Sequence, residues 1–275
     1  MFGTSVIVFR EVFEAGLAIG IIAAALGHAP MALRYIWGGV LAGVFGSLLM
    51  AIFAGGIASY FGGFGNELLT ASILILAVVM LAWHTLWMAT HGRQMAQDFR
   101  SLGQLAANGS KPMLAVATVV AITVLREGAE VMLFLYGAVA GSGSTALQSL
   151  IGGLIGIGLG GLVSYVTYKG LVRIPMRWVF SVTTGLIALL ASGMAAQAAH
   201  FLQAAGATNL LENEVWDWSA FLPDKGIPGT FLKALMGYSD RPTGLMLVAF
   251  SATLLVFILA NHFATSKPSS KRASA

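Results

Sequence analysis

The sequence contains one charged pattern twice, and each copy interrupts a long apolar stretch. REVFE at 10–14 lies in the apolar run 2–26, and REGAE at 126–130 lies in the run 113–139, so both read R-E-x-x-E. An ionisable residue at membrane depth costs roughly 3 kcal/mol and usually marks the path of a substrate or an ion. Two copies in separate apolar runs therefore predict one functional site inside a membrane.

The spacing within each copy indicates the kind of site. The two glutamates are three residues apart and the arginine lies four residues before the second one, so on a helix they share a face and can pair. Pairing offsets part of the cost of burial. Four carboxylates against two guanidiniums leave an excess of negative charge, which a cation with oxygen ligands would neutralise. We predict metal ligands at Glu11, Glu14, Glu127 and Glu130, supported by Arg10 and Arg126.

The elements that position these residues are predicted to be membrane helices. Hydrophobic residues make up 57% of the 275 residues and charged residues 9%, whereas about 25% of a soluble domain is charged. Apolar runs of about 20 residues are long enough to cross a bilayer. The first run lacks a basic leader and a cleavage site, which predicts a retained span rather than a signal peptide. The absence of cysteine excludes disulfides and thiolate metal sites.

The hydropathy pattern predicts an all-α integral membrane protein with seven transmembrane helices. Ten Lys and Arg residues lie in loops one, three and five and in the tail, against three on the other side, so the net charge of +4 does not indicate nucleic-acid binding. The positive-inside rule then places the N-terminus outside and the C-terminus in the cytoplasm. The predicted spans are 3–26, 35–58, 68–90, 113–139, 146–168, 178–203 and 243–263.

The two motifs also predict an internal repeat. Arg10 and Arg126 are 116 residues and three spans apart, and the same offset carries His84 onto His200. Three spans is an odd number, so the halves run in opposite directions, and inverted repeats of this kind hold their substrate near the membrane midplane. We predict one permease domain over 1–275, with repeats at about 1–112 and 113–204, an outer loop 205–242, a last helix 243–263 and a basic cytoplasmic tail 264–275.

Further candidates lie outside the motifs. His84 and His200 are predicted auxiliary ligands or proton acceptors, although a membrane histidine often only hydrogen-bonds to a neighbouring helix. Glycines at four-residue spacing, at 39 and 43 and at 152, 156 and 160, predict close helix packing. Acids in the outer loop predict either a vestibule that concentrates cations or a solvated loop, and these acids are Glu212, Glu214, Asp217, Asp224 and Asp240.

Other classes of protein fit the motifs less well. Pairs that only tie helices together would not need a second carboxylate on the same face. A di-iron oxidase would need Glu-x-x-His pairs, which neither motif contains. A membrane redox protein with b-type haem would need facing histidines, for which His84 and His200 are a single candidate pair. A proton-coupled carrier of an organic cation would use the carboxylates as proton acceptors, and the energy source stays open.

The doubled motif resembles that of the high-affinity, oxidase-dependent iron permeases, which carry R-E-x-x-E in the first and fourth of seven helices. Here REVFE at 10–14 and REGAE at 126–130 match in spelling and in span number. The stretch from Gln197 through His200 to Gln203, and the segment from Trp216 to Pro242, look like the bacterial branch. Fungal members also carry an acidic motif in the loop before the last helix, and this sequence has acidic residues there but not that motif.

The resemblance implies an iron permease, not an enzyme, in the cytoplasmic (inner) membrane of a bacterium. Its substrate would be Fe²⁺ or Fe³⁺, with no permanently bound cofactor, and Gln197 would be a further auxiliary ligand. Fungal members work with a multicopper ferroxidase and bacterial ones with periplasmic iron-binding or haem peroxidase proteins. Some relatives are associated with other metals such as lead, so the ion stays open, as does assembly into a homo-oligomer.

Overall fold

The chain forms a bundle of helices in a computed structural model. The structure describes residues 2–27, 29–60, 66–142, 146–170, 176–224 and 226–266. Within these ranges, eight helices follow one another in the order α1 (Phe2–Leu26), α2 (Ala32–Tyr60), α3 (Asn66–Ala107), α4 (Met113–Ser142), α5 (Ala146–Tyr168), α6 (Met176–Ala204), α7 (Ile227–Met236) and α8 (Gly244–Ser266).

The predicted all-helical class is confirmed, and several helices suit a membrane. Four stretches are long and apolar enough to cross a bilayer, and α8 contains a shorter apolar helix over Gly244–Ala260. The helices α1 and α4 coincide with predicted spans and carry the charged motifs. The seven crossings and their orientation stay predictions. The four stretches are Ala32–Phe53, Glu67–Met88, Leu147–Tyr168 and Val182–Ala204.

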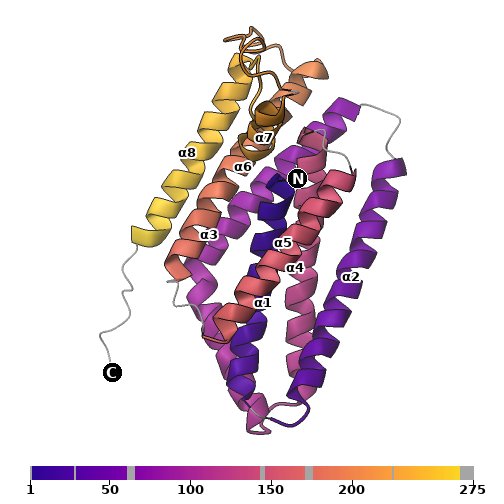
Figure 1. The fold of residues 1–275 in the computed structure, drawn as a ribbon, viewed down its shortest axis with the longest axis vertical. Coiled ribbons are helices and arrows are strands. Elements are labelled where there is room, and N and C mark those ends of the chain that lie inside the picture. The colour runs from indigo at the N-terminus through magenta and orange to yellow at the C-terminus, as the bar shows by residue number, and fades with distance from the viewer. Residues whose placement is uncertain are drawn as a thin grey trace.

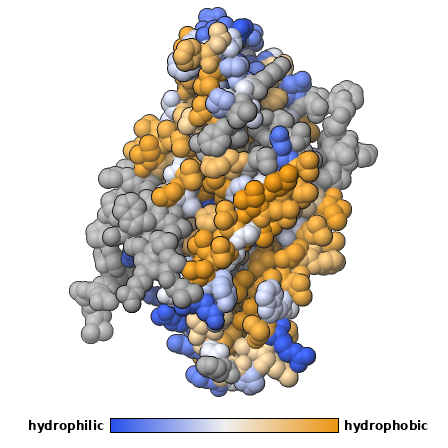
Figure 2. Space-filling model, viewed as in Figure 1, coloured by the Kyte–Doolittle hydropathy of each residue, from blue (hydrophilic) through white to orange (hydrophobic). Residues whose placement is uncertain are grey.

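The long helices alternate in direction along the bundle (Figure 1). In this view α1, α3 and α5 descend, α2, α4 and α6 ascend, and α7 lies near the upper end. We call the end of the bundle near α7 the α7 end. We call the other end, where α1 leads into α2 and α3 leads into α4, the opposite end. Figure 2 shows hydrophobic residues over the middle of the visible face and hydrophilic residues at both ends, as in a multi-pass membrane protein.

The helix α3 is longer than the span predicted at 68–90. It continues to Ala107, through the segment that the hydropathy pattern assigned to a loop with Arg93 and Arg100. Its 42 residues make it roughly 63 Å long, about twice the hydrocarbon thickness of a bilayer. The extra turns are amphipathic, because Leu102 and Ala106 are buried in a cluster with residues of α1, α2 and α4. Hydropathy alone misses a polar helix of this kind.

The predicted outer loop 205–242 contains a helix that packs into the bundle. The helix α7 contacts α6, α1 and α4 and ends at Gly237, whose φ of 64° lies in the left-handed region. The backbone of Gly237 touches Gly193 in α6 so closely that neither position has room for a Cβ atom. The pair of glycines therefore allows α7 to sit directly against α6.

This contact predicts a specific loss of stability. We expect Gly193→Ala to destabilise the protein by about 1–3 kcal/mol, because the new methyl group would overlap the backbone of α7. The matched control is Gly185→Ala on the same helix, where a Cβ atom meets nothing within 4 Å. Thermal unfolding in detergent compares the two variants, and equal midpoints would contradict the importance of the contact.

The helices that carry the motifs each pack along a helix that is distant in the sequence. The two largest helix contacts are α1 with α5 and α4 with α2. A Cβ atom at Gly156 would lie 2.7 Å from the Ser5 carbonyl oxygen of α1, and one at Gly43 would lie 2.7 Å from the Ala121 carbonyl oxygen of α4. The predicted packing role of these glycines is confirmed.

The packing is reciprocal at a third position as well. Ser164, four residues after Gly160, lies against Gly16 of α1, and Ser47, four residues after Gly43, lies against Gly128 of α4. Both packing helices therefore present a Gly-x-x-x-Gly-x-x-x-Ser stripe to a motif helix. The four-residue spacing of the glycines predicts their packing, whereas nothing in the sequence pattern distinguishes the serines.

Candidate metal centre

The structure brings both motifs and one histidine together inside the bundle. Glu11 and Glu14 come from α1, Glu127 and Glu130 from α4, and His84 from α3, and all five are at most 7% exposed. A ligand atom from each of four residues lies within 4.8 Å of the others, a spacing at which one metal ion could contact them all. These four residues are Glu11, His84, Glu127 and Glu130.

The first motif is held by a fully engaged arginine. The Nη1 atom of Arg10 donates to Oε1 of Glu11 at 2.8 Å, and its Nε atom lies 2.9 Å from Oε1 of Glu14. The Arg10 side chain is 5% exposed. A planar guanidinium can hold two carboxylates at once in this way, whereas an ammonium group offers a single point of charge. Arg10 therefore sets the positions of both glutamates.

The second motif has the same partners in a looser arrangement. Arg126 places Nη2 at 3.1 Å from Oε1 of Glu127 and Nε at 3.4 Å from Oε1 of Glu130, and its side chain is 36% exposed. Neither nitrogen is aligned for a hydrogen bond with a described residue. The guanidinium instead lies over the ring of Trp87, 5.4 Å from its centroid, at cation–π distance.

His84 joins the two motifs. Its Nε2 atom lies 3.2 Å from Oε2 of Glu14 in α1, and its Nδ1 atom lies 2.7 Å from Oε2 of Glu130 in α4. A neutral imidazole can donate from only one nitrogen, so this arrangement suits a protonated ring between two carboxylates. One side chain of α3 thus bridges a glutamate of each half.

Two buried oxygens are left for another partner. Oε2 of Glu11 and of Glu127 has no hydrogen bond from a described residue, whereas Oε2 of Glu130 has His84 as its partner. A buried acceptor without a partner costs about 1–3 kcal/mol. Carboxylate oxygens that converge without donors are the environment that a cation with oxygen ligands fits.

The second predicted histidine lies outside the cluster. His200 is exposed on α6, packs edge-on against Phe201 and does not belong to the group of four residues that converge. Gln197 is buried on the same helix. The offset that carries His84 onto His200 therefore does not bring the two histidines into one cluster.

The acids of the predicted vestibule fall into two groups. Lys233 donates to Asp224 at 2.8 Å, Arg241 lies 3.0 Å from Asp217, and the N–H of Asp240 donates to Asp224. Hydrogen bonds from Ser219, more than Arg241, hold the pKa of exposed Asp217 below its usual value. These acids stabilise the loop, whereas two others are exposed and without an ion pair among the described residues, Glu212 and Glu214.

Trp87 is the residue of this region that sequence reasoning missed. It lies three residues after His84 on α3, holds Arg126 by its ring face and stacks on His91, with ring centroids 5.2 Å apart. Nothing in its type or spacing distinguishes it from other aromatic residues of membrane helices. Only the packing of α3 against α4 assigns it a role.

Comparisons with known proteins identify the family of this chain. Residues 1–266 match the iron permease FTR1 family. The chain is 27% identical over 246 residues to the ferrous iron permease EfeU of Escherichia coli O6:H1, covering 88% of each chain, and 28% identical over 246 residues to EfeU of Yersinia pestis, covering 88% of this chain and 86% of the relative. No solved structure matches the chain. The predicted resemblance is confirmed, and the chain belongs to the iron permease FTR1 family.

Proposed function

We propose that this protein is an iron permease of the bacterial cytoplasmic membrane that binds its ion between the two R-E-x-x-E motifs. The observation that carries the proposal is the convergence of Glu11, Glu127, Glu130 and His84 within 4.8 Å inside an apolar bundle. Family membership and the names of the relatives, which are ferrous iron permeases, support iron as the substrate.

The proposed roles follow from the contacts. The unpartnered oxygens of Glu11 and Glu127, with the carboxylate of Glu130 beside them, would replace part of the hydration shell of the ion. An imidazole nitrogen suits iron, and His84 would become a further ligand once the ring has released its proton. Arg10 holds Glu11 and Glu14 in place and limits their mutual repulsion when the site is empty. Glu14 contacts His84 rather than joining the four, so we assign it to positioning that ring.

The reciprocal packing supports two inverted repeats with the site where they meet. The pairs α1 with α5 and α4 with α2 exchange equivalent helices between the halves, as a pseudo-twofold axis in the membrane plane would require. We propose that one repeat moves against the other to expose the site to each side in turn. The outer-loop acids that stay exposed, Glu212 and Glu214, would meet the ion or a periplasmic iron-binding or oxidase partner first.

The haem alternative is weakened by the position of its two histidines. Both ring nitrogens of His84 face carboxylates, and His200 lies exposed. A haem would need an imidazole nitrogen directed at its iron. A permease for another heavy metal uses the same oxygens, so transport itself must separate that candidate from iron.

The experiment that tests the function is uptake of radiolabelled iron. Metal-starved cells expressing the chain receive the isotope as Fe(II) or as Fe(III), with an excess of unlabelled lead or manganese in parallel. We expect more iron uptake than in cells that lack the chain. An excess of unlabelled iron should compete with this uptake, whereas an excess of lead or manganese should not. Absence of iron uptake with the protein present in the membrane would contradict the proposal.

The different settings of the two arginines predict different costs of substitution. We expect Arg10→Lys to lower iron uptake about 10–100-fold, the range seen when support of metal ligands is lost, because lysine cannot hold two carboxylates in a planar fork. Arg126→Lys should have a smaller effect, since Arg126 is half-exposed and poorly aligned. Initial rates of iron uptake at equal protein levels compare the two variants. Equal losses of uptake in both would contradict the difference between the two arginines.

A further inference from the structure

One helical turn from the metal centre, on the side of the α7 end, three helices each present a large apolar side chain. Ile7 lies four residues before Glu11, Leu81 three before His84, and Phe134 four after Glu130. Residues at this spacing share a helix face with the site residue. Because α4 runs opposite to α1 and α3 (Figure 1), all three lie on the same side of the centre.

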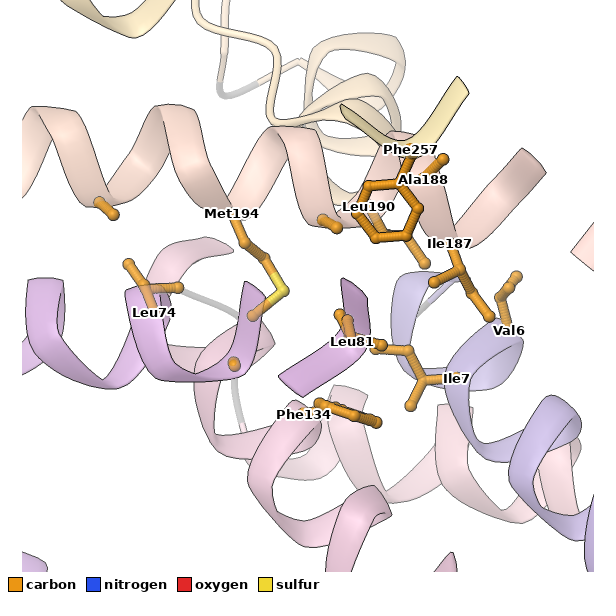
Figure 3. Packing of buried hydrophobic residues seen from close by; sticks show 13 residues of the cluster. Val6, Ile7, Leu74, Leu81, Phe134, Ile187, Ala188, Leu190, Met194 and Phe257 are labelled. Atoms are coloured by element: carbon orange, nitrogen blue, oxygen red, sulfur yellow. The ribbon is translucent and has the colours of Figure 1, made fainter. Parts of the chain in front are cut away.

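These three side chains pack together without a gap that solvent can reach. Ile7 and Leu81 are 1% exposed and Phe134 is 0% exposed, and all belong to one buried hydrophobic cluster. Figure 3 shows them directed toward one another from three helices, with Ile187, Leu190 and Met194 of α6 close by. Next to this cluster, α7 packs directly on α6 through Gly193 and Gly237.

The packing on the opposite side of the centre is looser. Leu17, Met88 and Thr123, each one turn from a site residue in that direction, are only partly buried. A cavity of about 410 Å³ also lies on this side of the centre, along α1 from Gly16 to Ala25 and between α1, α3 and α5, although no site residue lines it. The first turn on this side is therefore less densely covered than the first turn toward the α7 end, and a second buried cluster that contains Ile22 and Val120 lies farther along.

We propose that Ile7, Leu81 and Phe134 form the closed gate between the α7 end and the metal centre. Apolar constrictions block ions because water, and with it the hydration shell, is excluded from them. An ion arriving from the α7 end reaches the carboxylates only when these side chains separate. The inference rests on the proposed function, since a gate has meaning only where an ion passes. With this gate closed, the structure represents the state of the protein that is closed toward the α7 end.

The absence of native cysteine allows a direct test by site-directed labelling. Thr123→Cys places a thiol on the far side of the gate, and a separate Phe221→Cys variant, at a residue 95% exposed in the segment before α7, marks the α7 side. A small charged methanethiosulfonate that does not cross membranes is added to vesicles of either orientation. Thr123→Cys should react from the side opposite to Phe221→Cys and not from the same side.

Opening the gate should reverse this protection. In the Thr123→Cys background, we expect Phe134→Ala to raise labelling from the α7 side at least about 10-fold, because truncation leaves a space that water can fill. Phe257→Ala is the matched control, since Phe257 of α8 is buried in the same cluster but is not adjacent to a site residue. Ile7→Ala, a smaller truncation, should act in the same direction as Phe134→Ala.

The outcomes separate the gate from the function. Labelling from the α7 side before any truncation, equal labelling in the Phe134 and Phe257 variants, or no labelling from the opposite side would each overturn the gate. The readout needs no iron, so a chain that fails the uptake test can still show the gate. A chain that carries iron can equally fail to show it.

Discussion

The double variant Glu14→Gln/Glu130→Gln is expected to insert into the membrane and to lose iron uptake entirely. Glutamine keeps the size of glutamate and removes its charge. Four glutamates and two arginines carry a formal charge of −2, or −1 with the protonated His84, and the double variant brings this sum to 0 or +1, so a cation gains no neutralisation there. Both ends of the His84 bridge are also lost as anionic acceptors. We expect uptake to fall more than about 100-fold, beyond the range for loss of supporting groups.

The matched control is the exposed pair of outer acids. Glu212→Gln/Glu214→Gln removes the same amount of charge and the same number of carboxylates, from side chains that form no ion pair among the described residues. Uptake should then stay within about a few-fold of the wild type, as expected when charges only steer an ion. Uptake of radiolabelled iron at matched protein levels compares the variants. Normal uptake by the Glu14/Glu130 variant would remove these carboxylates from the mechanism.

His84→Ala is expected to lower both stability and uptake. Without the ring, carboxylates of Glu14 and Glu130 lose the group between them, and removing one partner of a buried ion pair costs about 3–5 kcal/mol. Loss of one ligand and of the position of another should lower iron uptake about 10–100-fold or more. Thermal unfolding in detergent measures the first effect, and the initial rate of uptake measures the second.

His200→Ala is the control that distinguishes position in the repeat from position in the site. His200 is the counterpart of His84 at the offset of the motifs, but it lies exposed and outside the group of converging residues. Its loss should change uptake and stability far less than the loss of His84. Equal effects of the two substitutions would show that the repeat position, rather than the contact with both motifs, determines the role of the histidine.

The family and the local geometry of the motifs could be predicted from the sequence. The spacing of Arg10 and Glu14 sets a contact across one helical turn, and the structure has it at 2.9 Å. Glycines four residues apart predict close helix packing in any bundle, and Gly43 and Gly156 show it. These features depend only on helix periodicity, so the order of residues along the chain is sufficient to predict them.

The contacts between distant segments could not be predicted in the same way. Nothing in the spacing distinguishes His84, which reaches both motifs, from His200, which lies exposed. Nor does it explain why Arg10 is buried while Arg126 is half-exposed over Trp87. Such differences arise where α3 packs against α1 and α4.

The amino-acid sequence by itself determined that this protein has two equivalent charged motifs within long apolar stretches, because the chemistry and period of each motif are local properties. Only the tertiary structure decided which histidine completes the cluster, how far α3 extends and that α7 packs into the bundle. Those outcomes depend on which apolar faces meet, and many faces of similar hydrophobicity compete in a chain in which 57% of residues are hydrophobic.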